Sequence, residues 1–132
     1  MKTTPPRNNF VAFEGKEFTV EWYYTENGKT PALDYFEGLS KLKKAQTLRL
    51  FELIATEGKI FNKQKFRHEG DGIYAFKPKP HRFLSFFYEN AKIIITNAFV
   101  KKRDDLPIEE KDRAQRCRED YISRCEKGTY YE

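Results

Sequence analysis

The segment that most constrains the fold of this chain is Lys92–Val100, which reads Lys-Ile-Ile-Ile-Thr-Asn-Ala-Phe-Val. Successive side chains of a strand point to opposite faces of its sheet, and here apolar residues occupy both sets of alternating positions. A strand that is apolar on both faces has to be covered on both sides. The segment therefore predicts a central strand with other elements packed above and below it.

Two further predicted strands come directly before this one. They are Ile73–Lys77 and Arg82–Tyr88, and short turn-like connections separate the three segments. Strands joined by such short connections pair as antiparallel neighbours. The sequence therefore predicts a three-strand antiparallel meander.

The N-terminal part predicts another strand. In Glu17–Tyr24 the apolar residues alternate with more polar ones, which is typical of a half-buried strand. The turn-like Glu14–Lys16 separates it from the apolar run Phe10–Phe13, so we expect these two segments to pair as a hairpin. The residues expected on the inner face are Phe18, Val20, Trp22 and Tyr24.

Three segments have helical spacing. Thr30 and Pro31 are typical of a helix start, as N-cap and first helical residue. Ser40 is expected to cap a second helix that ends at Gly58, and a third helix is expected to begin near Pro107. The predicted inner stripes are Leu42, Ala45, Leu48, Phe51, Ile54 and Ala55 in the second helix and Ala114, Cys117, Tyr121 and Cys125 in the third.

The predicted order is strand, two helices, three strands, helix, within 132 residues, which is the size of one domain. Helices grouped against an antiparallel sheet make an α+β domain. The large side chains expected in its core are Phe18, Trp22, Phe51, Ile54, Phe86, Ile95 and Phe99.

Composition excludes several classes of protein. With 39% hydrophobic residues the chain is too apolar to be disordered, and it has neither a membrane-spanning run nor the apolar core of a signal peptide, so we expect a cytoplasmic protein without a membrane partner. Cys117 and Cys125 would lie about 12 Å apart on a helix, too far for a disulfide. No zinc pattern or nucleotide-binding glycine motif is present, and we expect neither metal nor cofactor.

Positive charge is concentrated in the middle of the chain. Residues 58–103 hold 11 Lys or Arg and 3 Asp or Glu, a net charge of +8, whereas the whole chain has +5. Such a field favours a polyanionic partner, nucleic acid first, although a solvated basic surface is the ordinary alternative. The residues of this region that we expect to contact RNA are Lys63, Lys65, Arg67, His81 and Lys101.

A subset of these cations is expected to converge. Lys77 and Lys79 both precede proline, which favours extended backbone and so places both side chains on one face. Arg82 enters the next strand, and Lys101–Arg103 leaves the last strand at the same end of the meander. Such a cluster can hold phosphates or stabilise the transition state of metal-free RNA cleavage, with a lysine of lowered pKa as the base. Aromatic residues that could stack on bases, or simply belong to the core, are Tyr74, Phe76, His81 and Phe83.

From Phe18 to about Arg124 the chain resembles the RelE/HigB superfamily of type II toxin–antitoxin toxins, in its phage-derived HigB-like branch. The matching pieces are Phe18–Tyr24, Gly28–Phe36, the helix that ends in Glu57-Gly58, Arg82–Phe87 and Ile93–Lys102, followed by Pro107 and Ala114. The resemblance implies a RelE-like domain over residues 17–125, with two N-terminal helices packed on a twisted antiparallel sheet and a C-terminal helix. Residues 1–16 would be a loose extension or short extra strand, and residues 126–132 a tail.

The resemblance also implies a ribosome-dependent mRNA endoribonuclease, an mRNA interferase, that a cognate antitoxin blocks, here of the helix-turn-helix type. Arg82 matches the strand arginine near the scissile phosphate, and Lys102 and Arg103 match the basic group after the last strand. Lys77 stands where relatives usually have arginine, and Lys79 completes the expected catalytic set. Candidates for a catalytic tyrosine are Tyr121, Tyr130 and Tyr131. The alternative is a non-catalytic protein of the same fold that binds RNA, the ribosome or an antitoxin.

Overall fold

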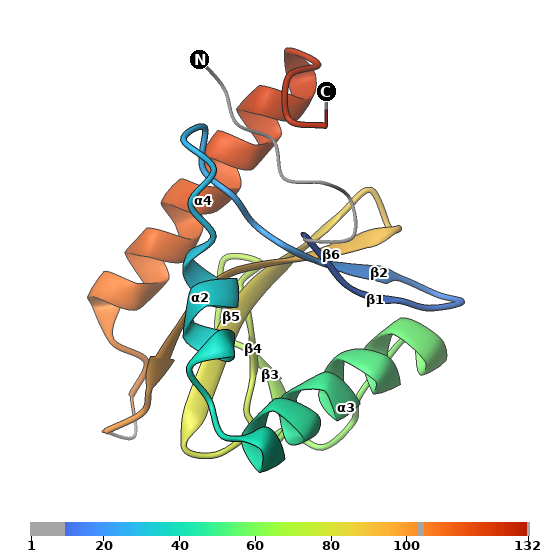
Figure 1. Cartoon of the computed structure of the whole chain (residues 1–132), viewed down its shortest axis with the longest axis vertical. Coiled ribbons are helices and arrows are strands. Elements are labelled where there is room, and N and C mark those ends of the chain that lie inside the picture. The colour runs from blue at the N-terminus through green and yellow to red at the C-terminus, as the bar shows by residue number, and fades with distance from the viewer. Residues whose placement is uncertain (1–9, 103–104, 132) are drawn as a thin grey trace.

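The computed structural model describes residues 10–102 and 105–131 as a six-stranded sheet with helices on both faces (Figure 1). The order in the sheet is β1-β2-β6-β5-β4-β3, so β6 lies between β2 and β5 and the expected central strand is confirmed. The strands are β1 (Val11–Glu14), β2 (Thr19–Trp22), β3 (Phe66–His68), β4 (Tyr74–Phe76), β5 (His81–Tyr88) and β6 (Lys92–Val100), and the helices are α2 (Pro31–Glu37), α3 (Lys41–Glu57) and α4 (Ile108–Glu126).

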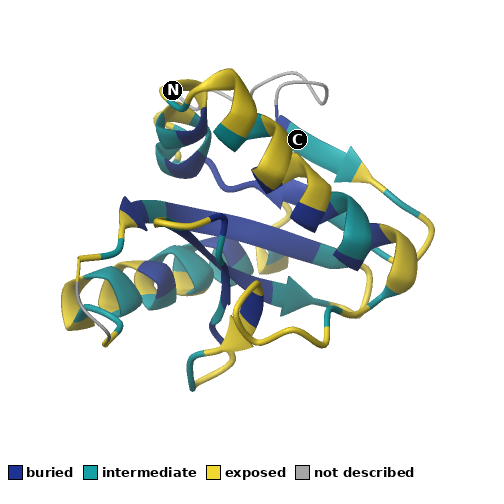
Figure 2. Ribbon diagram, turned by 90° about the horizontal axis from the view of Figure 1, so that it is seen from below, coloured by how far each residue is buried: buried dark blue, intermediate teal, exposed yellow. Residues whose placement is uncertain are grey.

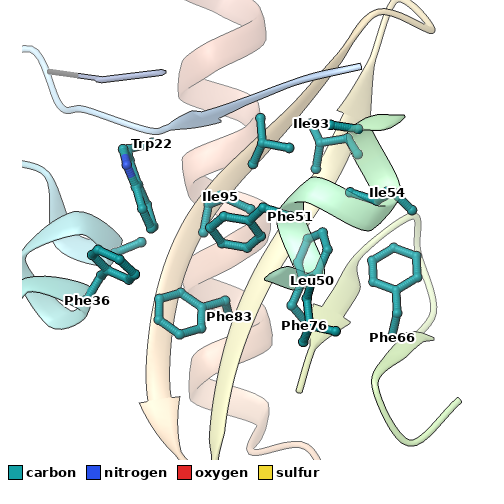
Figure 3. Close-up of a cluster of buried hydrophobic side chains, with 13 residues drawn as sticks. Trp22, Phe36, Leu50, Phe51, Ile54, Phe66, Phe76, Phe83, Ile93 and Ile95 are labelled. Carbon is teal, nitrogen blue, oxygen red and sulfur yellow. The ribbon is translucent and has the colours of Figure 1, made fainter. Parts of the chain in front are cut away.

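Two hydrophobic layers cover the two faces of the sheet. Ile93 and Ile95 of β6 pack with α2 and α3, whereas Ile94 packs with α4 on the opposite face. Figure 3 shows the first layer, where Phe51 of α3 lies among Trp22, Phe76 and Phe83. As a consequence, the central strands are buried and the outer surfaces of the helices are exposed, as Figure 2 shows. Of the expected core residues, Trp22, Phe51, Ile54, Phe86, Ile95 and Phe99 are buried, and Phe18 is half-buried.

The α+β class is confirmed, but the expected arrangement is wrong in two respects. β2 pairs with β6 in parallel, from Thr19 beside Lys92 to Trp22 beside Ile95, so the sheet is mixed rather than antiparallel. The hairpin β1–β2 precedes α2 and α3, so these are not N-terminal helices. The parallel pairing is possible because the chain passes through two helices and three strands between β2 and β6, and such a long crossover allows it.

The short connections behave as the sequence predicts. The predicted meander β4–β5–β6 is confirmed. An additional strand, β3, pairs with β4 at its edge, and β3 is too short for its side-chain pattern to be recognised in the sequence. The hairpin of β1 and β2 is also confirmed, and its turn contains Gly15. A side-chain carbon at Gly15 would lie 2.5 Å from the carbonyl oxygen of Ala55, so only glycine lets the turn approach α3 this closely. The division of the chain into extension, domain and tail stays a prediction.

The capping residues predicted the ends of the helices more accurately than the apolar spacing predicted their buried faces. Ser40 Oγ accepts the Lys43 N–H at 3.2 Å, and Gly58 ends α3 with a positive φ of 82°. Thr30 occupies the N-cap position of α2, yet its hydroxyl bonds to Asp34 rather than capping the helix. The N-terminal half of the stripe predicted for α3 is wrong, since Leu42 is 64% and Leu48 37% exposed, whereas Phe51, Ile54 and Ala55 are buried as predicted. The buried face runs through Thr47, Leu50, Phe51, Ile54 and Ala55, which repeat at the helical period.

The second face of β2 is buried as well, contrary to the prediction of a half-buried strand. Glu21 on this face is 4% exposed. Tyr24, just after β2, packs in the α4 layer rather than on the inner face with Val20 and Trp22 as predicted. Tyr130 stacks on Tyr24, with ring centroids 4.2 Å apart. Arg124 of α4 is 5% exposed and donates to the carbonyl oxygen of Tyr24 at 2.8 Å and to Asp120 at 2.7 Å. These polar contacts connect α4 to the strand. Within residues 10–102 and 105–131, no helix combines the length and apolar character needed to cross a bilayer.

We predict that Phe51→Ala lowers the free energy of unfolding by about 3–5 kcal/mol, because it removes a fully buried ring and leaves a cavity. Chemical denaturation of the purified protein measures this change. The matched control is Phe61→Ala, which truncates a ring that is 82% exposed and should change stability by less than about 1 kcal/mol. Equal effects of the two substitutions would contradict the packing described here.

Candidate functional site

One end of the sheet brings several basic segments together. The N–H of Lys101, just after β6, donates to the carbonyl oxygen of Pro80 at 2.8 Å, just before β5. The N–H of Lys77, just after β4, donates to the carbonyl oxygen of Lys65 at 2.8 Å, just before β3. The strands therefore begin or end side by side here, and the cations at their ends share one edge of the molecule.

Strand alternation decides which of these cations meet. Phe66, Phe76 and Phe83 all belong to the core on the α2 and α3 side of the sheet. Neighbouring strand residues point to opposite sides of a sheet, so each phenylalanine has a neighbour on the other face. The neighbours at this end of the sheet are the residues after Phe66, after Phe76 and before Phe83. These three residues are Arg67, Lys77 and Arg82.

The three cations line a small cavity of about 40 Å³, which we call the sheet-end groove. Arg82 is the deepest of them, only 6% exposed, and its Nη1 donates to the carbonyl oxygen of His81 at 2.9 Å. The ammonium of Lys77 donates to the carbonyl oxygen of Lys63 at 3.1 Å. The described residues that line it are Arg67, Glu69, Lys77, Arg82, Phe99, Lys101, Asp105 and Leu106.

The groove lowers the pKa of two of its cationic groups, Lys77 and Arg82. Burial is the main reason that the pKa of Lys77 lies below that of a solvated lysine, and the positive charges of Arg82, Arg67 and Lys101 lower it further. Glu69 acts in the opposite direction and raises the pKa of Lys77. Burial also lowers the pKa of Arg82, which nevertheless keeps its charge because a guanidinium titrates far above neutral pH. The site therefore combines a permanent cation with an adjacent lysine that loses its proton more readily than usual.

The other expected site residues lie outside this groove. Lys65 and Lys79 are exposed on the α3 side of the sheet end, where both line a separate groove. Lys63 and Lys102 are exposed and line neither groove. Arg103 lies outside the described residues. The structure therefore brings together four of the expected cations, namely Arg67, Lys77, Arg82 and Lys101.

His81 also faces the α3 side, where its Nδ1 lies 2.7 Å from the hydroxyl of Tyr35. Burial lowers the pKa of His81, with further lowering by Lys43 and Arg82, and this favours the neutral imidazole. A neutral imidazole held by a tyrosine hydroxyl is a hydrogen-bonding group rather than a positive charge. The expected contact of His81 with RNA phosphate would therefore lack the attraction between opposite charges.

Most of the aromatic residues suggested for base stacking are structural. Phe76 and Phe83 are completely buried, so stacking by these two residues is ruled out. Tyr74 is half-buried, with its ring stacked on Phe66 and beside His68. Inner-face strand positions are normally occupied by core aromatics, which explains this outcome.

The three tyrosines considered for catalysis lie far from the sheet-end groove. The hydroxyl of Tyr131 donates to Glu21 at 2.6 Å, and the ammonium of Lys92 lies 3.8 Å from the centre of its ring. Lys92 begins β6, whereas the groove lies at the end of that strand. Tyr121 and Tyr130 are buried in the core beside α4. These tyrosines complete a hydrophobic layer and do not contribute to the groove.

The sequence prediction missed two carboxylates of the groove, Asp105 and Glu69, and a signal in the sequence could have found Glu69. Glu69 lies two positions after Arg67, so an extended chain would have placed both side chains on one face. That signal was lost because β3 was not predicted. Among residues 10–102 and 105–131, no group of three or more His, Cys, Asp or Glu side chains is arranged to hold a metal ion.

We predict that Glu69→Gln lowers the pKa of Lys77, because it removes the negative charge that stabilises the ammonium form. Arg67→Gln should raise the same pKa, since it removes a neighbouring positive charge. Both changes can be followed by NMR titration of the lysine side-chain signals. Glu57→Gln, at the far end of α3, is the control and should leave the titration of Lys77 unchanged; shifts of equal direction in the first two variants would contradict the arrangement.

Comparison with known proteins adds a family to this geometry. No curated protein matches the sequence. A family model described as "Phage derived protein Gp49-like (DUF891)" matches residues 34–119, which is more than half of the chain and includes α3, the four strands β3–β6 and the first part of α4. The matched region contains every described residue that lines the sheet-end groove. This chain therefore belongs to the phage-derived Gp49-like family.

Proposed function

We propose that this protein is the toxin of a type II toxin–antitoxin system and cleaves mRNA on the ribosome without a metal ion. The observation that carries the proposal is the sheet-end groove, in which a buried Arg82 lies among Arg67, Lys77 and Lys101. Family membership supports it, because the Gp49-like family is one of RelE/HigB-like toxins. The expected partners are a helix-turn-helix antitoxin and translated mRNA in the cytoplasm.

The proposed reaction is an internal transfer at one phosphate of the RNA. The 2′-hydroxyl loses its proton, its oxygen forms a bond to the adjacent phosphorus, and the bond from phosphorus to the 5′-oxygen breaks. The leaving oxygen takes up a proton, which gives a 2′,3′-cyclic phosphate and a free 5′-hydroxyl. Negative charge develops on the phosphate oxygens in the transition state, so fixed cations accelerate this step.

Arg82 is suited to stabilise that charge. Its planar guanidinium can hold two phosphate oxygens at once and keeps its charge at any physiological pH. Its backbone belongs to β5, paired with β6 through Phe99, so the sheet holds it in place. Lys101 and Arg67 add positive charge at the mouth of the groove, where a phosphate enters. Rigid placement of this kind is what makes a cation effective in a transition state.

Lys77 is suited to be the general base. Its pKa lies below that of a solvated lysine because of burial and neighbouring cations, so a larger fraction is neutral and able to accept the 2′-hydroxyl proton. After the transfer the ammonium can return the proton to the leaving oxygen. Lys79, on the other side of the sheet end, is instead placed to contact the RNA backbone.

A second candidate function is binding without cleavage. The observation that favours it is the absence of any Tyr, His, Ser or Thr among the described residues that line the sheet-end groove. Without such a group, proton transfer in the groove depends on its lysines, Lys77 and Lys101, and on the carboxyl groups of Glu69 and Asp105. In this alternative the groove holds an RNA phosphate, and the protein acts by occupying the ribosome or by binding its antitoxin.

Arg82→Ala should reduce the rate of mRNA cleavage by about 10²–10³, because it removes a donor aimed at developing charge. Arg82→Lys should restore part of the rate, since lysine keeps the charge but lacks the planar fork. Cleavage of a translated message, with mapped transcript ends, measures both. Arg116→Ala, an exposed cation on α4, is the control. If the folded Arg82→Ala variant cleaves at the wild-type rate, the active site lies elsewhere. If the wild-type protein binds ribosomes but cleaves no mRNA, the result favours the binding function.

Lys77→Arg should abolish the increase in cleavage rate with rising pH. The neutral form of Lys77 is the active base, so the wild-type rate rises as pH rises toward its lowered pKa, whereas arginine cannot lose its proton. Single-turnover rates across the neutral and mildly alkaline range measure this. Lys79→Arg is the matched control and should keep the wild-type pH profile; a retained profile in Lys77→Arg would exclude Lys77 as the base.

A further inference from the structure

A larger groove lies on the opposite side of the same sheet end, between α3 and the segments before β3 and after β4. Its volume is about 680 Å³, within the range of about 300–1,000 Å³ that is usual for small-molecule sites. We call it the α3 groove. The core side of the groove contains Leu50, which Figure 3 shows on α3 above the sheet.

All the charged residues described in the lining of the α3 groove are basic, and one of them, Arg49, is ion-paired with Glu52 at 3.1 Å. Among the residues that the structure describes, five cations and no carboxylate line it: Lys43, Arg49, Lys65, Lys77 and Lys79. The ammonium of Lys43 donates to the carbonyl oxygen of Lys79 at 2.7 Å, which holds α3 against the connection after β4 and keeps these two lysines together. A site with this charge is complementary to a polyanion.

The base of the groove has a different character from its rim. Leu50, which is 5% exposed, and Leu53 provide an apolar surface. The side chains of Gln46, Asn62 and Gln64 surround it with amide groups. A nucleobase has apolar faces and edges that carry hydrogen-bond donors and acceptors, so an apolar floor bordered by amides and cations suits a nucleotide better than an acidic peptide.

The α3 groove and the sheet-end groove share one lining residue. Lys77 lines both, so it marks the place where the two grooves meet. An RNA strand with one phosphate beside Arg82 would pass Lys77 and reach the α3 groove within its next nucleotides. This adjacency at Lys77 favours a second part of the same ligand over an independent partner.

We propose that the α3 groove binds a nucleotide of the RNA strand that flanks the phosphate in the sheet-end groove. The base lies on Leu50 and Leu53, and its phosphate lies between Lys43 and Lys79. The inference rests on the proposed function, because it assumes that the ligand is RNA. It adds a second binding site, for a nucleotide next to the phosphate in the sheet-end groove. Lys43 and Lys79 are RNA-binding residues in this assignment and take no part in proton transfer.

The first test measures binding of a fluorescein-labelled single-stranded RNA to the full chain by anisotropy at several salt concentrations. The double variant Lys43→Ala/Lys79→Ala should bind about tenfold more weakly, since it loses charge-assisted hydrogen bonds. Its log affinity should also depend less steeply on log salt, by about 0.7 for one lost phosphate contact. The control is Lys41→Ala/Lys127→Ala, which has the same net charge and alters two exposed lysines outside the groove. Thermal melting establishes that both variants fold.

The second test concerns the base. Replacing single nucleotides of the RNA by abasic residues should identify one position at which wild-type binding falls several-fold, because stacking on the floor is lost. That penalty should disappear in Leu53→Ala, which removes part of the floor, and persist in Leu48→Ala, an exposed leucine of the same helix. A penalty that persists equally in both variants would overturn the placement of the base.

The outcomes separate this inference from the proposed function. If wild-type protein cleaves mRNA but the Lys43/Lys79 variant binds RNA as the control does, the α3 groove inference fails alone. If binding depends on this lysine pair and no variant or wild-type protein cleaves, the inference stands and the proposed cleavage fails. Unlabelled RNA and a poly-glutamate peptide of equal net charge can each be tested as competitors of the labelled RNA. If the peptide displaces the labelled RNA at a lower concentration than unlabelled RNA does, the groove binds an acidic polypeptide and the inference is overturned.

Discussion

The burial of β6 on both faces is the constraint on which the rest of the structure depends. Ile93 and Ile95 require the layer formed by α2 and α3, and Ile94 requires the layer formed by α4. Removal of this apolar surface from water is the main source of stability for a domain of this size. Because β5 is paired with β6 along its length, the same strand also fixes Arg82 opposite Phe99. The hydrophobic core and the position of the candidate site therefore have one origin.

Strand alternation lets one stretch of sequence serve both purposes. In β3, β4 and β5 an aromatic residue enters the core on one face, and its neighbour brings a cation to the other face. Gathering like charges and partly burying them costs free energy in the free protein, and Glu69 offsets only part of that cost. A bound phosphate would remove the repulsion, so the groove is stabilised more by an anion than by water.

Periodicity and capping residues predicted the meander, the hairpin, the ends of α3 and the covered central strand, because each depends on local chemistry. The parallel pairing of β2 with β6 depends on a crossover of about seventy residues, which no local pattern reports. For the site, the sequence indicated which cations share an end of the sheet. It did not predict that Lys77 lines the sheet-end groove while Lys79 lies outside it. Which face of the sheet each lysine reaches depends on how the surrounding core packs, and the local sequence does not report that packing. Glu69 was missed because β3, the three-residue strand that it follows, was too short to recognise.

The stacking of Tyr24 on Tyr130 has a consequence for the order of folding during synthesis. The backbone N–H of Tyr24 donates to the Tyr130 hydroxyl across 106 positions of sequence. On a translating ribosome, the layer with α2 and α3 can form as soon as β6 has emerged, whereas the layer with α4 must wait until Tyr130 has been made. Contacts this distant in sequence also close slowly. A nascent chain therefore passes through a stage in which one face of the sheet is covered and the face that carries Arg82 is still bare.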